Sequence, residues 1–204
     1  RSSDLWLQAR ASDDDPCDGG GAALAEAWHD GRKQALRDAF AATGLSFADE
    51  AAGRAIEGLD VWGTQWVAQH RDACEATAVR HEQSDAGLDL RMRCLQGRRR
   101  AMDALVGVLA SADASTVESA GQAVASLPEP EYCAELEALR AEVPPPEDPA
   151  ARQRVDELMA ALERVDALAA TARFAEARGA LDEARAAAAA IEHPPLHVEV
   201  GLRE

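Results

Sequence analysis

The sequence predicts an all-α protein, in which antiparallel helical hairpins form a bundle and a further helical pair follows it. Apolar residues make up 47% of the chain, yet aromatic residues make up only 4%. Alanine, the strongest helix former, supplies much of the apolar fraction. Few segments alternate between apolar and polar residues, and runs of β-branched residues are missing, so the pattern disfavours strands.

The chain is strongly acidic. It has 37 acidic and 21 basic residues and a net charge of −16. This charge repels phosphate groups, so we expect no nucleic acid and no anionic membrane surface as a partner. The longest near-continuous apolar run, residues 186–191, is too short to cross a bilayer, and we expect no direct membrane insertion by this chain. Because the chain begins at Arg1, we expect it to be a piece of a longer protein.

Residues 1–16 are predicted to form an acidic linker, with Leu5, Trp6 and Leu7 as its only apolar cluster. The aspartates near its end lack the spacing and the closing glutamate of a calcium-binding loop, which favours a solvated linker. A cysteine-bearing helical domain is predicted over residues 17–142. Its first long helix is expected over residues 21–43 and ends before Gly44.

Two long helices, over residues 46–82 and 84–112, are predicted to fold back on each other about a turn near Ser84. Residues equidistant from that turn lie opposite each other, and three of the resulting pairs are large and apolar, as a buried seam requires. The pairs are Trp66 with Met102, Trp62 with Val106, and Leu59 with Leu109. In the same register Cys74 faces Cys94.

Three glycines weaken the first helix of this hairpin by roughly 1 kcal/mol each relative to alanine. They are Gly53, Gly58 and Gly63. We expect them to let a neighbouring helix approach closely, with a kink as the alternative. The second helix carries an arginine triplet, residues 98–100, which is expected to pair with nearby carboxylates. An anion site is the alternative.

A capping box of Ser115 and Glu118 predicts a short helix over residues 115–127. A second short helix is expected over residues 131–142. The proline-rich run over residues 143–149 predicts a stiff linker, and we place the domain boundary there.

A helical pair is predicted over residues 150–190, within a second domain over residues 150–204. Its second helix has the aromatic, small and large residues of a tetratricopeptide repeat at the expected spacing, and we interpret them as core residues. They are Phe174, Ala177, Leu181 and Ala184. Ala172 stands where glycine is usual and the closing proline comes late, so a chance alanine-rich hairpin is the alternative. Residues 194–204 resemble the opening helix of a further repeat, and a stack needs about three repeats.

Four cysteines form an even set without CxxC spacing, and four cysteines allow three pairings. The hairpin geometry favours a bridge between Cys74 and Cys94, which leaves Cys17 to pair with Cys133. Disulfides imply an oxidising compartment such as a bacterial periplasm.

Two other interpretations of the cysteines stay open. Buried free thiols are common in cytosolic cores. A metal site is the other interpretation, because His70 lies one helical turn before Cys74, with Cys94 across the seam. A structural zinc site needs four ligands, and no fourth can be named.

No phosphate-binding loop, nucleophile elbow, zinc-protease motif or kinase loop occurs in the sequence, so we expect no enzymatic activity and no cofactor. A cysteine–histidine nucleophile would need Cys74 with His70, and a bridged or buried Cys74 disfavours it.

Several marks follow one another in order: "PCDGG", "WVAQHRDACEAT", "LDLRMRCLQGRRRAMDAL", "LPEPEYC", a proline break and the repeat-like helix. Over residues 15–191 this order resembles the region C-terminal to the kinase domain in large bacterial serine/threonine protein kinases that carry tetratricopeptide repeats. The resemblance implies a sensory or protein-interaction region, outside the cytoplasm and downstream of a membrane helix. None of the kinase's catalytic residues lies in this chain, and the degenerate repeat with its late proline departs from the pattern.

The first hypothesis is therefore a non-catalytic interaction or sensor module of such a kinase, with a protein or peptide as its partner. It would be the periplasmic part of an inner-membrane protein, with a cytoplasmic location as the alternative. The second hypothesis is a structural spacer or a dimerisation element that forms a homodimer. The third is a thiol- or metal-based redox sensor that uses His70, Cys74 and Cys94.

Overall fold

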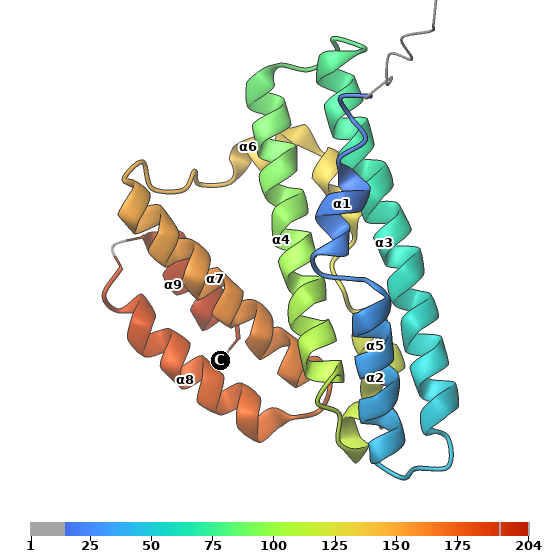
Figure 1. The fold of residues 1–204 in the computed structure, drawn as a ribbon. Helices are drawn as coiled ribbons and strands as arrows, with labels where there is room; N and C mark the ends of the chain where they lie inside the picture. The colour runs from blue at the N-terminus through green and yellow to red at the C-terminus, as the bar shows by residue number, and fades with distance from the viewer. Residues whose placement is uncertain (1–14, 192, 204) are drawn as a thin grey trace, which may run out of the picture.

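The computed structural model describes residues 15–191 and 193–203, and no strand occurs among them. The predicted all-α class is therefore confirmed. Figure 1 shows a helical bundle with a separate pair of helices leaning against one side of it. Within this part of the chain no helix has the length and apolar character needed to cross a membrane.

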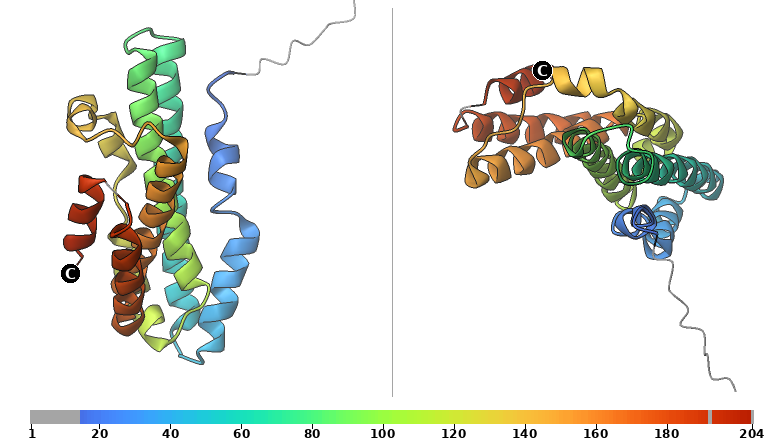
Figure 2. Two further views of the ribbon diagram at one scale, coloured as in Figure 1. Left: turned by 90° about the vertical axis from the view of Figure 1, so that its left-hand side faces the viewer. Right: turned by 90° about the horizontal axis from the view of Figure 1, so that it is seen from above.

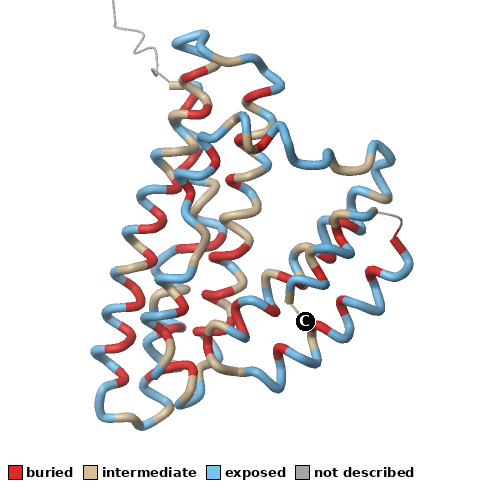
Figure 3. Tube along the Cα trace, turned by 180° about the vertical axis from the view of Figure 1, so that it is seen from behind, coloured by how far each residue is buried: buried red, intermediate tan, exposed pale blue. Residues whose placement is uncertain are grey.

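The centre of the bundle is the antiparallel pair α3 (Ala48–Ala78) and α4 (Asp85–Leu109) (Figure 1). Ser84 caps α4, because its Oγ accepts a hydrogen bond from the N–H of Gly87 at 3.3 Å. Along both helices buried residues recur between exposed ones, as a one-sided apolar stripe produces (Figure 3). The predicted hairpin and its turn are confirmed.

The seam between α3 and α4 is apolar and pinned by one polar contact. All six residues of the predicted apolar pairs are buried in a single hydrophobic cluster. Trp66, the largest fully buried side chain, donates from Nε1 to the carbonyl oxygen of Leu95 at 2.7 Å. Its indole therefore fills the seam without leaving a buried donor unpaired.

α1 (Gly20–Ala25) and α2 (Asp30–Ala42) pack against α3. The prediction of one long helix over residues 21–43 is wrong, because the chain leaves the helix after Ala25 and a new helix begins at Asp30. His29 caps the second helix, with Nδ1 accepting from the N–H of Gly31 at 3.2 Å. Gly44 follows α2 with a φ of 72°, a conformation that glycine adopts without strain.

α5 (Ala114–Ala125) packs on α3, and it is followed by the 3₁₀ helix η1 (Pro130–Ala134) and by α6 (Leu136–Ala141). The predicted capping box of Ser115 is wrong: Asp113 caps α5, and its carboxylate accepts from the N–H of Thr116 at 2.8 Å. The helix expected over residues 131–142 is two short pieces.

The C-terminal part consists of α7 (Pro149–Ala170), α8 (Phe174–Ala188) and α9 (Pro194–Gly201) (Figure 2). These helices share a second hydrophobic cluster. α7 also packs against α4, and residues at its C-terminal end, with Ala177 of α8, belong to the first cluster. The two clusters therefore meet along α7, and the domain boundary at residues 143–149 stays a prediction.

The disulfides join Cys17 to Cys74 and Cys94 to Cys133, with Cα–Cα distances of 5.4 and 5.6 Å. All four predicted cysteines are bridged, but the pairing expected from the hairpin, Cys74 with Cys94, is wrong. Equal distance from the turn fixes a residue's height along the hairpin but not the direction of its side chain.

Each central cysteine is displaced by one residue from the buried seam. Cys74 follows the buried Ala73, and Cys94 precedes the buried Leu95. One residue rotates a side chain by about 100° around a helix, so the two sulfurs flank the seam. Seen from above, α1 and α6 lie on opposite sides of the α3–α4 pair (Figure 2), and each central cysteine meets the partner on its own side.

We expect each bridge to contribute to stability through the loop it closes. The bridges span 57 and 39 residues, for which the chain-entropy model gives about 4 kcal/mol each. Serine pairs at positions 17 and 74, and at 94 and 133, should each lower the free energy of unfolding by this order in urea titrations. Peptide mapping without reduction checks the pairing, and a peptide that links Cys74 to Cys94 would contradict it.

The glycines of α3 differ in what surrounds them. A Cβ at Gly58 would lie 2.7 Å from Cγ1 of Val124 in α5, and one at Gly63 would lie 2.9 Å from Cδ2 of Leu24 in α1. A Cβ at Gly53 would meet nothing within 4 Å. The expected close approach of neighbouring helices is confirmed at Gly58 and Gly63 and is wrong at Gly53.

Alanine substitutions at Gly53 and Gly58 form a matched pair. Gly53→Ala should raise the free energy of unfolding by about 1 kcal/mol, because helix propensity improves and space is open. Gly58→Ala should lose that gain, because the stiff Val124 side chain must move. Thermal or urea unfolding of both variants measures the difference, and equal stabilisation would show that α5 does not approach α3 as described.

Candidate functional site: an arginine-lined cleft between α4, α6 and α7

The residues of the repeat pattern take two different environments. Ala177, Leu181 and Ala184 are buried, as predicted for core positions. Phe174 is 65% exposed, so its interpretation as a core residue is wrong. It is the first residue of α8. Ala172 has a φ of 60°, so a non-glycine residue holds the left-handed position that glycine usually takes.

The alternative site of His70, Cys74 and Cys94 is not assembled. The two cysteines belong to different disulfides, so neither is a thiolate ligand or nucleophile. His70 packs beside Trp66, with ring centroids 5.2 Å apart, and desolvation by burial lowers its pKa. Among the described residues no three His, Cys, Asp or Glu side chains gather as a metal site would require.

The three arginines of the triplet lie in different environments. Arg99 pairs with Glu26 at 2.6 Å, as the sequence predicts. Arg98 lies over the ring of Tyr132, 5.4 Å from its centroid, and forms no ion pair with a described residue. Arg100 also forms none, and its Nε is buried without a hydrogen-bond partner in the described part of the chain. The expectation of carboxylate pairing is therefore right for one residue of the three.

Arg100 belongs to a cleft of about 550 Å³ between α4, α6, the proline-rich linker and α7. Four arginines line this cleft, and none forms an ion pair with a described residue, although the chain has a large excess of carboxylates. They are Arg93, Arg100, Arg140 and Arg152. Among the described residues only two carboxylates line it, Glu142 and Asp156, so this part of the lining is locally basic in an acidic protein.

Apolar side chains line the cleft between these charges. Leu139 of α6 and Val155 of α7 are buried, and Met159 of α7 stands beside them. The wall opposite α4 includes Val143, which is 62% exposed, and Pro144 and Pro145 follow it in the linker. The cleft therefore offers both apolar contact and hydrogen-bond donors, as binding sites do.

Arg152 has a structural task in this wall. Its Nε donates to the carbonyl oxygen of Pro146 at 3.2 Å, and its Nη2 donates to that of Glu147 at 3.3 Å. It therefore holds the linker against the first turn of α7. Arg93 and Arg140 are exposed and do not hold the linker in this way. Arg93 makes one weak contact with its own helix, and Arg140 makes no hydrogen bond with a described residue.

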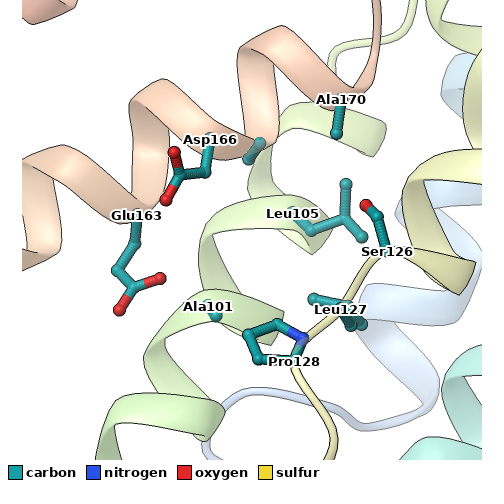
Figure 4. Close-up of a pocket in the computed structure, with 9 residues that line it drawn as sticks. Ala101, Leu105, Ser126, Leu127, Pro128, Glu163, Asp166 and Ala170 are labelled. Atoms are coloured by element: carbon teal, nitrogen blue, oxygen red, sulfur yellow. The ribbon is translucent and has the colours of Figure 1, made fainter. Parts of the chain in front are cut away.

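A smaller cavity of about 170 Å³ lies farther along the same interface between α4 and α7, where Ala101 and Leu105 of α4 face Glu163 and Asp166 (Figure 4). Asp166 is paired with Arg203, whose Nε and Nη2 donate to it at 2.8 and 2.7 Å. Burial raises the pKa of Glu163 to about 7, and the charge of Asp166 adds to the rise. The charges of Arg100 and Arg98 on α4, and of Arg203 after α9, oppose the rise.

Comparisons with protein-family models, with curated proteins and with solved structures found no match. The resemblance to kinase-linked regions therefore rests on the order of its own residues.

Sequence reasoning missed Arg93, Arg140, Arg152 and Glu163. A signal for one of them is present: Arg93 lies seven residues before Arg100, which places both on one face of a helix. Arg140 and Arg152 have no such signal, because only the packing of α6 and α7 brings them to α4.

The raised pKa of Glu163 predicts a pH dependence of stability. The folded state binds this proton more tightly than the unfolded chain, so its contribution is greatest below about pH 4.5 and is lost as pH rises to about 7. Between pH 5 and pH 8 the free energy of unfolding of the parent protein should therefore fall by about 2 kcal/mol more than that of the Glu163→Gln variant.

Urea unfolding at both pH values measures this difference against the parent protein. Glu118→Gln, at an exposed residue of α5, is the matched control and should leave the pH dependence unchanged. If Glu163→Gln shows the same slope as the parent protein, the carboxyl group is not buried as described.

Proposed function

We propose that this chain is a non-catalytic interaction and sensor module in which a protein or peptide partner docks in the arginine-lined cleft. The single observation that supports this most is the pair of exposed arginines, Arg93 and Arg140, that form no ion pair with a described residue and line a cleft with apolar side chains. In a chain of net charge −16, intramolecular pairing would satisfy these groups at little cost. Unpaired donors beside apolar side chains favour a ligand from outside.

The position of the cleft suggests how binding is relayed. One wall is α4 of the first hydrophobic cluster, and another is α7, most of whose buried residues belong to the second. A partner that contacts both walls favours one relative position of the two parts over others. The module therefore converts occupancy into a change at the helical pair, to which further repeats would attach.

The proposal includes the context that the resemblance implies, a bacterial serine/threonine protein kinase with tetratricopeptide repeats. The order of the cysteine- and tryptophan-bearing segments supports this context. Two disulfides support an oxidising compartment, and we propose the periplasmic side of an inner membrane.

The experiment uses the full-length protein encoded by the gene. We expect a kinase domain and a membrane helix upstream of Arg1. The double variant Arg93→Glu and Arg140→Glu should change autophosphorylation by about fivefold or more, in the range of typical coupling energies. Arg37→Glu is the control, because Arg37 is an exposed arginine on α2, outside the cleft, that forms no ion pair with a described residue.

Two results would count against the proposal. A reading frame without kinase motifs would remove the kinase context. Equal autophosphorylation in the cleft variant, the Arg37 variant and the parent protein would show that the cleft plays no part in signalling.

A further inference from the structure

The chemistry of the cleft limits what can occupy it. Arg93 and Arg140 are exposed and lack carboxylate partners, and the Nε of Arg100 is buried without an acceptor among the described residues. A guanidinium group presents a planar fork of donors that matches a carboxylate in two-point contact. The missing partners are therefore acceptors with negative charge.

The spacing of the arginines on α4 indicates an elongated ligand. Arg93 and Arg100 are two helical turns apart, so their Cα atoms are separated by about 10 Å along the helix axis. A peptide in the extended polyproline II conformation advances about 3.1 Å per residue with three residues per turn, so side chains three positions apart lie on the same side, about 9 Å from each other. Carboxylates three positions apart in this conformation match the two arginines of α4.

The apolar residues of the cleft lie between these charges. Leu139 and Val155 are already buried, so the apolar surface that the cleft offers to a ligand consists of Val143 and Pro144 of the linker and the partly buried Met159 of α7. A single inorganic anion would leave this surface uncovered. A nucleic acid carries a phosphate at every nucleotide, so its charges would continue beyond the cleft onto the surface of a protein of net charge −16, which opposes binding. A short segment with two carboxylates keeps its charges beside the arginines.

We propose that the cleft binds an extended acidic peptide segment of a partner protein, with two carboxylates three residues apart and apolar residues between them. This proposal rests on the proposed function, because it names the partner for the same site. Arg93 and Arg100 receive the two carboxylates, Arg140 of α6 supports one of them, and the apolar side chains contact Val143 and Met159.

The test is a titration of the chain with fluorescein-labelled peptides, followed by fluorescence anisotropy. The probe is GELLEG with blocked ends, and its matched control is GQLLQG, which keeps the shape and removes both carboxylates. A second control, GESSEG, keeps the charges and removes the apolar residues. Inorganic phosphate serves as the small-anion competitor.

We expect saturable binding of GELLEG that weakens with added salt, and weaker binding of both controls. The double variant Arg93→Gln and Arg140→Gln should weaken binding roughly tenfold, while Arg37→Gln should leave it unchanged. Because all three arginines are on exposed residues, circular dichroism and urea unfolding should show that the variants keep the fold.

Three results would overturn the inference: no saturable binding, equal binding of GELLEG and GQLLQG, or displacement by phosphate with equal binding of GESSEG. The last would mean a small-anion site. If GELLEG fails while the cleft variant still changes autophosphorylation, the peptide chemistry is wrong and docking at the cleft survives. If both experiments fail, the proposed function fails with it.

Discussion

The structure depends on the seam between α3 and α4. Trp66 fills it and donates to Leu95, and Arg91, only 4% exposed, connects α4 to Asp72 of α3 at 2.7 Å and to the carbonyl oxygen of Cys133 at 3.2 Å. A buried guanidinium group is costly unless its donors are satisfied, so these contacts fix the place of η1 as well as the register of the hairpin. The other bundle helices pack on surfaces that this seam creates.

The charge of the chain is distributed unevenly around that seam. On α4, Arg91 is buried and paired with α3, and Arg99 points to Glu26 near α1. Arg93 and Arg100 lie on the side that faces α6 and α7, where few carboxylates occur. Helix α4 thus uses Arg91 and Arg99 in ion pairs within the bundle, whereas Arg93 and Arg100 contribute to the basic surface of the candidate site.

Features that depend on one local segment could be predicted from the sequence, whereas contacts between distant segments could not. The apolar stripes of α3 and α4 and the turn near Ser84 are local, and they were predicted from the sequence. The break at His29 was not, because the surrounding residues suit a helix and histidine is an unusual cap. The bridge from Cys74 depends on where the segment before α1 lies, and the cleft depends on the docking of α6 and α7.

Because of the disulfide from Cys94 to Cys133, one side of the candidate site is held covalently and the other is not. Cys94 lines the cleft on α4, and Cys133 lies in η1, three residues before α6 begins. Two walls of the cleft are therefore tied covalently, whereas α7 is held by packing against α4 and by the linker contacts of Arg152. A ligand that bridges the cleft acts against a fixed side and a side held by weaker forces. Binding is then expected to shift α7 rather than the disulfide-linked side, and the helices that follow α7 move with it.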